Sequence, residues 1–285
     1  MSGESTLAVI VRLVPFSETS FVVTLLTRDF GRLSAIAKGA RRPKGPFEGS
    51  LDLLAVCRVV VIRKTSDRLD LLTEAKLHRR FRAAEKSLPR LYAGYAVAEL
   101  LRILIDDDEP HTEVYDLTIA TLQQIDSDGP VQATLLCFQA QLLRLLGHQP
   151  SLDRCAECGE VFSEHTSAGP AAGNQAIARV SSVMPFSLVS GGLVCSQCRS
   201  SSQQNVGLPH ATVEILRNLF DPLPSFASHL AFESHIATVR RQMGSVNSTH
   251  YHALRGVIDR WIASIAGQVP KMQTLVSQRL MEESR

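Results

Sequence analysis

The 285-residue sequence has few aromatic side chains and no long hydrophobic run. Aromatic residues make up 6% of the chain, although hydrophobic residues reach 45%. No stretch approaches the roughly 18 consecutive apolar residues of a membrane-spanning helix, so we expect no membrane segment. The N-terminus, MSGESTLAVIVRLV, has no basic region before a long apolar stretch, so we do not expect a secretory signal peptide. These absences favour a cytoplasmic protein.

The sequence also lacks the short motifs of common enzyme classes. It contains no P-loop, no HExxH pair and no GxSxG nucleophile elbow. The tripeptide Asp29-Phe30-Gly31 matches a kinase motif, but no glycine-rich loop accompanies it and it falls at an expected hairpin turn. Four consecutive acids, Asp106–Glu109, could suggest a nuclease, but consecutive residues point in different directions. We interpret them as a helix end followed by an acidic turn, and we expect no active site.

Positive and negative charge are separated along the chain, although the net charge is only +2. Residues 1–90 carry 17 Lys and Arg against 9 Asp and Glu, whereas residues 91–130 carry 1 against 9. The densest cationic segment, KGARRPK, contains Lys38, Arg41, Arg42 and Lys44. Cations grouped on a loop neutralise phosphates and release condensed counterions. The segment is predicted to bind a polyanion, with an ordinary solvated loop as the alternative.

Five strand-like segments lie within the first 75 residues. Five short strands without an intervening helix indicate a small closed barrel, such as the oligonucleotide-binding (OB) fold, which presents a sheet face and loops to nucleic acid. An SH3-like barrel would give much the same pattern. The segments are rich in Val, Ile, Leu or Thr and are separated by turn residues: 6–14, 21–27, 32–38, 55–64 and 68–75.

A second basic stretch, Lys76–Arg82, follows these strands. It could continue the surface formed by the first basic loop, or it could be a connector whose charges face water. We assign three further arginines to the predicted phosphate-binding surface: Arg32, Arg79 and Arg80.

Most of the remaining chain is predicted to be helical. Pro89 suits the first turn of a helix that runs to Ile105, because the missing N–H costs nothing there. Trp261 is expected to anchor a core, and Cys57 and Cys137 are expected to be small core residues. Residues after Pro270 are predicted to form a disordered tail. Further helical patterns cover 113–125, 131–146, 211–220, 226–243 and 251–267.

Two Cys-x-x-Cys pairs, Cys155/Cys158 and Cys195/Cys198, give the clearest chemical signal. Four thiolates close a tetrahedral site around one zinc ion, so we predict one structural zinc per chain. The 36 residues between the pairs exceed the usual zinc-ribbon spacing, and we attribute the excess to the insertion at 163–176. The alternative is a set of redox-active or simply buried thiols. His165 could compete as a ligand but is interpreted as a bystander.

These patterns predict a multidomain α+β protein. An N-terminal OB-fold β-barrel is followed by an all-α helical bundle, which a four-cysteine zinc module interrupts. The predicted parts are the barrel at 1–80, a first helical part at 81–150, the zinc module at 151–205, a second helical part at 206–270 and the tail at 271–285.

Three segments of the sequence resemble the bacterial recombination mediator RecO family. They are residues 27–44 (TRDFGRLSAIAKGARRPK), residues 142–155 (LLRLLGHQPSLDRC) and residues 191–195 (GGLVC). The resemblance covers residue 7 to about residue 198, and the long insertion after the first cysteine pair departs from the family. It implies an OB barrel, a helical bundle and a zinc module whose ligands are Cys155, Cys158, Cys195 and Cys198.

The resemblance also implies a non-enzymatic activity in DNA repair and a location at the nucleoid. Such proteins bind and anneal single-stranded DNA and also contact double-stranded DNA. Their partners are RecR and the C-terminal tail of single-stranded-DNA-binding protein, and through them RecA. On this chain, the family's basic OB loop corresponds to Lys38, Arg41, Arg42 and Lys44.

The partner's acidic tail ends in an aromatic ring, so it needs an apolar pocket and a nearby cation. We place it near Arg144 or Arg154, beside apolar residues of the expected third helix, with ordinary surface charge as the alternative. A zinc-ribbon transcription or RNA-processing factor with an OB-like barrel would share the basic loop and the metal. An enzyme such as a nuclease is disfavoured by the closed metal site.

Overall fold

A computed structural model describes residues 3–42, 45–47, 49–64, 69–162, 183–200, 204–226, 229–244 and 249–282. The chain divides into two compact units. Unit 1 comprises Met1–Phe138, Leu223–Ala237 and Pro270–Arg285, and unit 2 comprises Gln139–Pro222 and Thr238–Val269. Helices α3 (Val131–Leu145) and α5 (His229–Met243) supply residues to both units.

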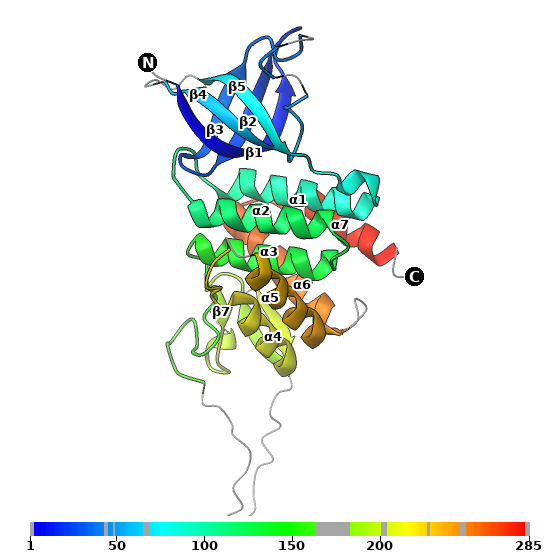
Figure 1. Ribbon diagram of the computed structural model, residues 1–285. Helices are drawn as coiled ribbons and strands as arrows, with labels where there is room; N and C mark the ends of the chain where they lie inside the picture. Colours follow the sequence, from blue (N-terminus) through cyan, green and yellow to red (C-terminus); the bar gives the residue numbers. More distant parts are fainter. Residues whose placement is uncertain are drawn as a thin grey trace, which may run out of the picture. The chain divides into compact units, whose positions relative to one another are not determined.

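Unit 1 begins with a closed five-stranded barrel, which appears in blue and cyan in Figure 1. The strand order is β1-β2-β3-β5-β4, with β3 and β5 parallel and the other pairs antiparallel. This arrangement confirms the predicted OB fold. The strands are β1 (Glu4–Pro15), β2 (Phe21–Thr27), β3 (Gly31–Ala37), β4 (Val56–Ile62) and β5 (Asp70–Arg79).

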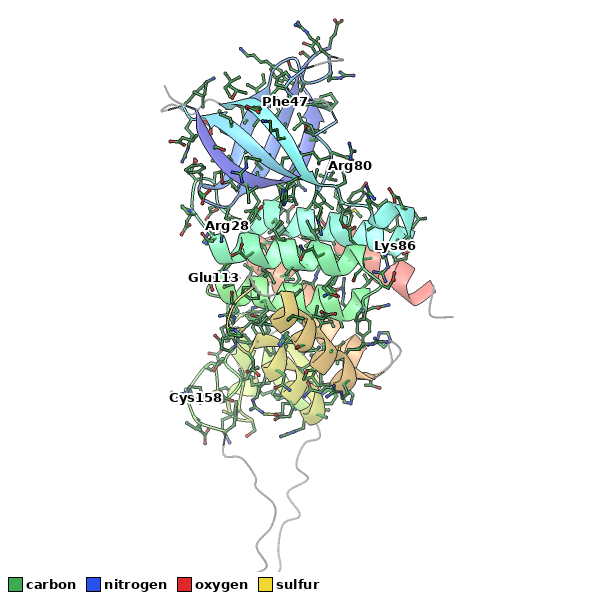
Figure 2. All side chains as sticks on the ribbon, viewed as in Figure 1. Arg28, Phe47, Arg80, Lys86, Glu113 and Cys158 are labelled. Atoms are coloured by element: carbon green, nitrogen blue, oxygen red, sulfur yellow. The ribbon has the colours of Figure 1, made fainter. Side chains whose placement is uncertain are left out.

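The barrel core follows the two-residue period of its strands. In β3, Leu33, Ala35 and Ala37 are buried while the residues between them are partly exposed, as alternation of side chains across a sheet requires. Phe47, labelled in Figure 2, belongs to this core and is only 3% exposed. Cys57 also lies in it, as predicted, and burial raises the pKa of its thiol to about 11.

The helices of unit 1 begin with a well-defined cap. The Ser87 hydroxyl accepts a hydrogen bond from the backbone N–H of Arg90 at 3.4 Å, and proline occupies the first turn, as predicted. Helix α1 (Leu88–Leu104) follows the short 3₁₀ helix η1 (Ala83–Glu85) and precedes α2 (Thr112–Asp126). The acidic run lies between α1 and α2, after the end of α1, as predicted.

The prediction of a disordered tail is wrong for residues 271–282, which form helix α7 (Lys271–Glu282). The carboxylate of Glu99, on α1, accepts hydrogen bonds from the backbone N–H groups of Lys271 at 3.0 Å and Met272 at 2.8 Å. These bonds satisfy two of the donors that every helix leaves free at its N-terminus. Val276 is fully buried, so a tertiary cap and a packed face stabilise a helix of modest apolarity.

Unit 2 contains a small sheet that the sequence analysis did not predict. Strands β6 (Val183–Ser187), β7 (Gly192–Leu193) and β8 (Asn205–Pro209) pair antiparallel in the order β7-β6-β8. Proline at positions 185 and 209 weakens the strand pattern of β6 and β8, because it cannot donate a ladder hydrogen bond. The segment after the last cysteine is therefore partly a strand.

Helices α4 (His210–Phe220) and α6 (Thr249–Ala266) follow this sheet, and a 3₁₀ turn η2 (Cys198–Ser200) precedes β8. Trp261 on α6 is 6% exposed, and its ring lies 5.7 Å from Phe186 and 5.8 Å from Phe220 between centroids. The predicted core anchor is thus confirmed. Among the described residues, no helix combines the length and apolarity that crossing a bilayer requires.

Candidate nucleic-acid face and metal centre

The predicted basic loop begins where β3 ends and turns sharply at Gly39. Gly39 has a φ of +73°, and its carbonyl accepts a hydrogen bond from the backbone N–H of Arg42 at 3.0 Å. Lys38 and Arg42 are exposed on either side of this turn. No acid in the described part of the chain forms an ion pair with either residue. Lys44, the fourth predicted cation, lies outside the described residues.

Arg41 fastens this loop to the β1–β2 turn. Its backbone N–H donates to the carbonyl of Thr19 at 3.0 Å, and its Nη1 donates to the carbonyl of Ser17 at 3.1 Å. The guanidinium also lies 5.7 Å from the centroid of the Phe21 ring, within the range of a cation–π contact. Arg41 therefore holds the loop in place, whereas Lys38 and Arg42 leave their charges open to a ligand.

Arg32 and Arg79, assigned from sequence to the phosphate-binding surface, lie instead against acids of unit 1, one in the run after α1 and one at the end of α2. Arg32 is 2.9 Å from Asp107, and its side chain is 18% exposed. Arg79 is 3.4 Å from Asp126, and burial lowers the pKa of its guanidinium. The structure thus gives both arginines a role between barrel and helices, and a DNA-binding role for them stays a prediction.

Arg80, labelled in Figure 2, is exposed and donates from Nη2 to the carbonyl of Gly49 at 2.8 Å. Its charge is available at the surface while one donor steadies the connection between β3 and β4. Sequence reasoning did not single out Arg58, an exposed β4 residue that lies directly opposite Lys76 of β5. The register of β4 and β5 brings these two cations together, and this register is not evident from the sequence.

The acidic run after α1 neutralises one side of the barrel. Asp108 pairs with Arg63, and its backbone N–H donates to the Arg32 carbonyl at 3.0 Å. Gly31 permits this approach, because a Cβ there would lie 2.0 Å from the carbonyl oxygen of Glu109. The nuclease alternative for these acids therefore gains no support, because two of the four acids are held by arginines of the barrel.

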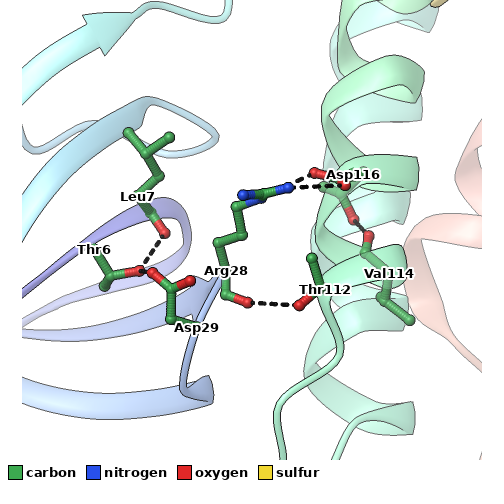
Figure 3. Close-up of polar contacts among 8 residues, drawn as sticks. Thr6, Leu7, Arg28, Asp29, Thr112, Val114 and Asp116 are labelled. Carbon is green, nitrogen blue, oxygen red and sulfur yellow. Dashed lines mark hydrogen bonds and ion pairs between the residues drawn. The ribbon is translucent and has the colours of Figure 1, made fainter. Parts of the chain in front are cut away.

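Figure 3 shows a second contact of this kind, between the turn that follows β2 and helix α2. Arg28 lies 3.3 Å from Asp116, and the hydrogen bond to that carboxylate raises the pKa of Arg28. The Thr112 hydroxyl donates to the Arg28 carbonyl at 3.3 Å, while the Thr6 hydroxyl donates to Asp29 at 2.6 Å. Asp29 thus belongs to a turn, as predicted, and not to a kinase site.

In Figure 2, Arg28 lies on the side of the barrel that faces α2, whereas Phe47, just after the basic loop, lies away from it. Arg28, Arg32, Arg63 and Arg79 are paired with acids of the segments that follow the barrel, whereas Lys38 and Arg42 have no such pair among the described residues. The two charge blocks seen in the sequence therefore meet in unit 1. They leave a cationic loop free at the other end of the barrel.

The four predicted metal ligands come together in unit 2. The sulfur atoms of Cys155, Cys158, Cys195 and Cys198 all lie within 4.8 Å of one another. A tetrahedral zinc ion with Zn–S bonds of about 2.3 Å separates its ligands by about 3.8 Å, and Cys158 and Cys195 are 3.8 Å apart between sulfurs. A disulfide would require about 2.05 Å. The geometry fits four-thiolate coordination of one metal ion.

Each cysteine pair lies in a turn of its own, and the two turns have the same hydrogen-bond pattern. The N–H of Gly159 donates to the Cys155 carbonyl at 2.9 Å, and the N–H of Arg199 donates to the Cys195 carbonyl at 3.0 Å. Gly159 has a φ of +76°, which favours glycine. Each turn aims two sulfurs at one point, and the Cys195 N–H donates to the Cys155 sulfur at 3.3 Å.

The electrostatics of the cluster favour a cation. Burial opposes ionisation of Cys155, but backbone N–H donors, from Cys158 and Cys195 among others, lower its pKa to about 6. Hydrogen bonds to the sulfurs of Cys195 and Cys158 instead raise the pKa of Cys198 to about 12. Without a metal, Cys155 therefore ionises readily and Cys198 keeps its proton. A divalent metal would favour the ionised form of Cys198 as well, because metal ligation requires the thiolate.

The two arginines proposed for the partner's tail both lie in unit 2, Arg144 on α3 and Arg154 in the segment that follows this helix. Arg144, in the last turn of α3, donates from Nε to the Gln141 side chain at 2.9 Å. Gln141 in turn donates to the carbonyls of Leu219 at 2.7 Å and Asp221 at 2.9 Å. Arg154 is exposed beside the first metal ligand. Of the two, Arg144 is oriented by a chain of hydrogen bonds that runs through Gln141.

An OB barrel with an exposed basic loop, a helical part and a four-thiolate cluster together define a class. This is a multidomain α+β protein with an oligonucleotide-binding fold and a metal-binding cysteine module. Family comparison makes the assignment specific. "Recombination protein O N terminal" matches residues 1–81, and "Recombination protein O C terminal" matches residues 85–241. The chain belongs to the RecO family of DNA repair proteins.

Individual relatives support this assignment along nearly the whole chain. The DNA repair protein RecO of Rhodopirellula baltica is 44% identical over 287 residues, which cover 96% of this chain and 99% of the relative. RecO of Anaeromyxobacter sp. (strain K) is 34% identical, with 75% and 77% covered. RecO of Myxococcus xanthus is 30% identical, with 76% and 83% covered. The family resemblance noted in the sequence is therefore confirmed.

Proposed function

We propose that this protein is a recombination mediator that binds and anneals single-stranded DNA and, with RecR, helps RecA displace single-stranded-DNA-binding protein. The main support is the separation of charge in unit 1. Arg28 is paired with an acid of α2, and Arg32 and Arg63 are paired with acids of the run after α1, whereas Lys38 and Arg42 remain exposed on a loop of an OB barrel. Such a loop suits the binding of phosphate.

Annealing needs little more than neutralised phosphates and accessible bases. Two complementary strands repel one another through their backbones, and cations that replace condensed counterions weaken that repulsion. Contacts to phosphate carry no sequence information, so both single-stranded and double-stranded DNA can bind the same loop. No step in this process breaks a covalent bond, so the proposed activity requires no catalytic residue.

The metal in this proposal is one structural zinc ion per chain. The four sulfurs leave no open coordination position at which water could be activated, and the ion would connect the loop at Cys155 to the segment before η2. Zinc would contribute folding free energy to unit 2. The DNA-binding loop belongs to unit 1, so losing the metal should affect folding more than intrinsic DNA contacts.

The partner's acidic tail is proposed to bind in unit 2, near Arg144 or Arg154. Arg144 is the better-supported of the two, because the Gln141 side chain orients its guanidinium. An oriented guanidinium loses less freedom when a carboxylate binds. A site in unit 2 would let one molecule hold the tail while the loop in unit 1 holds DNA.

The deciding experiment is annealing of complementary strands that are already coated with their binding protein, with and without this chain. We expect the chain to accelerate annealing, and the Lys38→Ala/Arg42→Ala variant to lose most of that effect. Adding RecR and RecA tests the mediator step. No acceleration with purified, folded protein, or a strong preference for RNA, would favour the alternative of a transcription or RNA-processing factor.

A further inference from the structure

A cavity of about 380 Å³ opens in the barrel between the β1–β2 turn and the basic loop. Its lining includes one aromatic residue, Phe16, together with the cations Lys38 and Arg42 and the hydroxyl residues Ser17 and Ser20. This volume lies near the lower end of the range for small-molecule sites. The cavity therefore suits one small planar group with an anionic attachment.

The exposure of Phe16 is unusual for this chain. Its side chain is 63% exposed, and it is the only aromatic residue among the large hydrophobic residues exposed in the described part of the chain. By contrast, Phe47 is 3% exposed and belongs to the barrel core. A phenyl ring gains free energy when a ligand removes it from water. An exposed ring that shares a cavity with cations is typical of proteins that bind single strands.

The two segments that carry the ring and the cations are joined to each other before any ligand arrives. The Phe16 backbone N–H donates to the Ser20 carbonyl at 3.0 Å, which closes the turn. Arg41 then joins this turn to the basic loop through its bonds to Ser17 and Thr19. Arg41 acts as a positioning residue, and the cavity lies between two segments that it connects.

We propose that this cavity is a base-stacking subsite, in which one base of single-stranded DNA stacks on Phe16 while Lys38 and Arg42 hold adjacent phosphates. The inference rests on the proposed DNA-binding function and specifies which residue contacts a base. Stacking accepts any base, because every base has a π-face. A duplex keeps its bases stacked on one another, so this subsite would favour single strands over the same length of duplex.

An acidic peptide that ends in an aromatic ring is the competing occupant. Its terminal ring would need apolar walls on several sides. Phe16 and Ile36 are the apolar side chains that line this cavity, and hydroxyl residues and cations supply most of the rest. A flat base with polar edges is better matched to such a lining than a phenyl ring is.

The test compares Phe16→Ala and Phe16→Trp in the full chain, with Leu88→Ala as the control. Leu88 is 56% exposed at the start of α1, so it matches the loss of an exposed apolar side chain. The probes are an oligothymidylate, an abasic strand of equal length and a duplex of equal length. Thermal unfolding checks that each variant is folded.

Phe16→Ala should weaken oligothymidylate binding by about 5- to 150-fold, the effect of losing one stacked base. It should leave the affinities for the abasic strand and the duplex nearly unchanged. The slope of affinity against salt should also stay the same, since no charge is removed. Phe16→Trp should retain oligothymidylate binding, and Leu88→Ala should behave as the natural protein.

Each remaining outcome overturns the inference in a recognisable way. If Phe16→Ala binds oligothymidylate normally while Lys38→Ala/Arg42→Ala binds weakly, the DNA-binding loop stands and the base subsite is refuted. If neither variant weakens binding, the proposed DNA face fails together with the subsite. If Phe16→Ala loses only the ability to bind an acidic peptide that ends in phenylalanine, the cavity is a peptide-binding site.

Discussion

Arg32 of β3 and Asp107, in the acidic run after α1, form an ion pair with 2.9 Å between Nε and Oδ1. The pair shows what the acidic run does in unit 1. It neutralises cations on the helix side of the barrel, so that the positive charge of the first 90 residues is concentrated elsewhere. In the folded protein, unpaired positive charge of this basic segment therefore remains on the loop that carries Lys38 and Arg42.

The contact beside this pair gives the first prediction. Gly31→Ala should destabilise unit 1 by roughly 2–5 kcal/mol, because φ is +73° there and the new Cβ would meet the Glu109 backbone at 2.0 Å. Gly39→Ala is the matched control, with the same φ of +73° but its nearest neighbour 3.8 Å away. It should cost about 1–2 kcal/mol. Thermal or denaturant unfolding measures both, and equal losses would show that the Glu109 contact is unimportant.

The second prediction separates free cations from paired ones. Lys38→Ala/Arg42→Ala should flatten the log–log salt dependence of single-strand binding by about 1.4 units, at about 0.7 for each phosphate contact. Arg28→Ala also removes a cation from the barrel, but Arg28 already pairs with Asp116 at 3.3 Å. Its salt slope should match that of the natural protein. Titrations at several salt concentrations decide the matter, and equal slopes for all three proteins would exclude the loop as the phosphate contact.

Much of the barrel could be predicted from sequence because its strands carry their own signals. The predicted strand 21–27 has the bounds of β2, and turn residues mark the hairpins. Helix α7 could not be found in this way, because the Glu99 cap comes from a distant helix. Strands β6 and β8 were missed since they are short and contain proline.

The same distinction applies to the candidate sites. The cysteine spacing predicted the cluster that the structure shows. Each Cys-x-x-Cys turn brings two sulfurs together locally, so the fold has only to place the two turns side by side. The aromatic residue beside the basic loop was not predicted. Phe30 and Phe47 are aromatic residues close to the loop in sequence but are partly or fully buried, whereas barrel closure brings Phe16 beside the loop. Charge alone groups Arg32 and Arg79 with the loop, because their acidic partners Asp107 and Asp126 are distant in sequence.

The third prediction concerns metal uptake and pH. The pKa of Cys198 is raised to about 12, so in metal-free protein its thiol is protonated at neutral pH. Zinc must displace that proton, so acid competes with the metal and the affinity for zinc should fall as pH falls from 8 to 6 (roughly the range of metal–proton competition). A chromophoric chelator measures this competition.

Substitution of one ligand gives the control for the metal prediction. Cys155→Ser should bring bound zinc well below one ion per chain and lower the thermal stability of unit 2. Cys137→Ser, in a fully buried position outside the cluster, should keep the zinc even if it is destabilised. Retention of a full equivalent of zinc by Cys155→Ser, or an affinity independent of pH, would contradict four-thiolate binding.

The last prediction concerns the acidic tail of single-stranded-DNA-binding protein. Arg144→Ala should weaken binding of the isolated tail peptide by about tenfold or more, since a charge-assisted hydrogen bond contributes about 1.5–3 kcal/mol. Gln141→Leu should weaken it less, because the guanidinium keeps its charge but loses the partner at 2.9 Å that orients it. Arg154→Ala tests the second proposed cation. Arg240→Ala, which removes an exposed arginine in the last turn of α5, is the control.

Calorimetry measures binding of the peptide to each variant. A separate DNA titration should show that these variants leave bare-DNA affinity unchanged. If Arg144→Ala and Arg154→Ala bind the peptide normally while Lys38→Ala/Arg42→Ala does not, both ligands share the basic loop, and one molecule cannot hold them at separate sites.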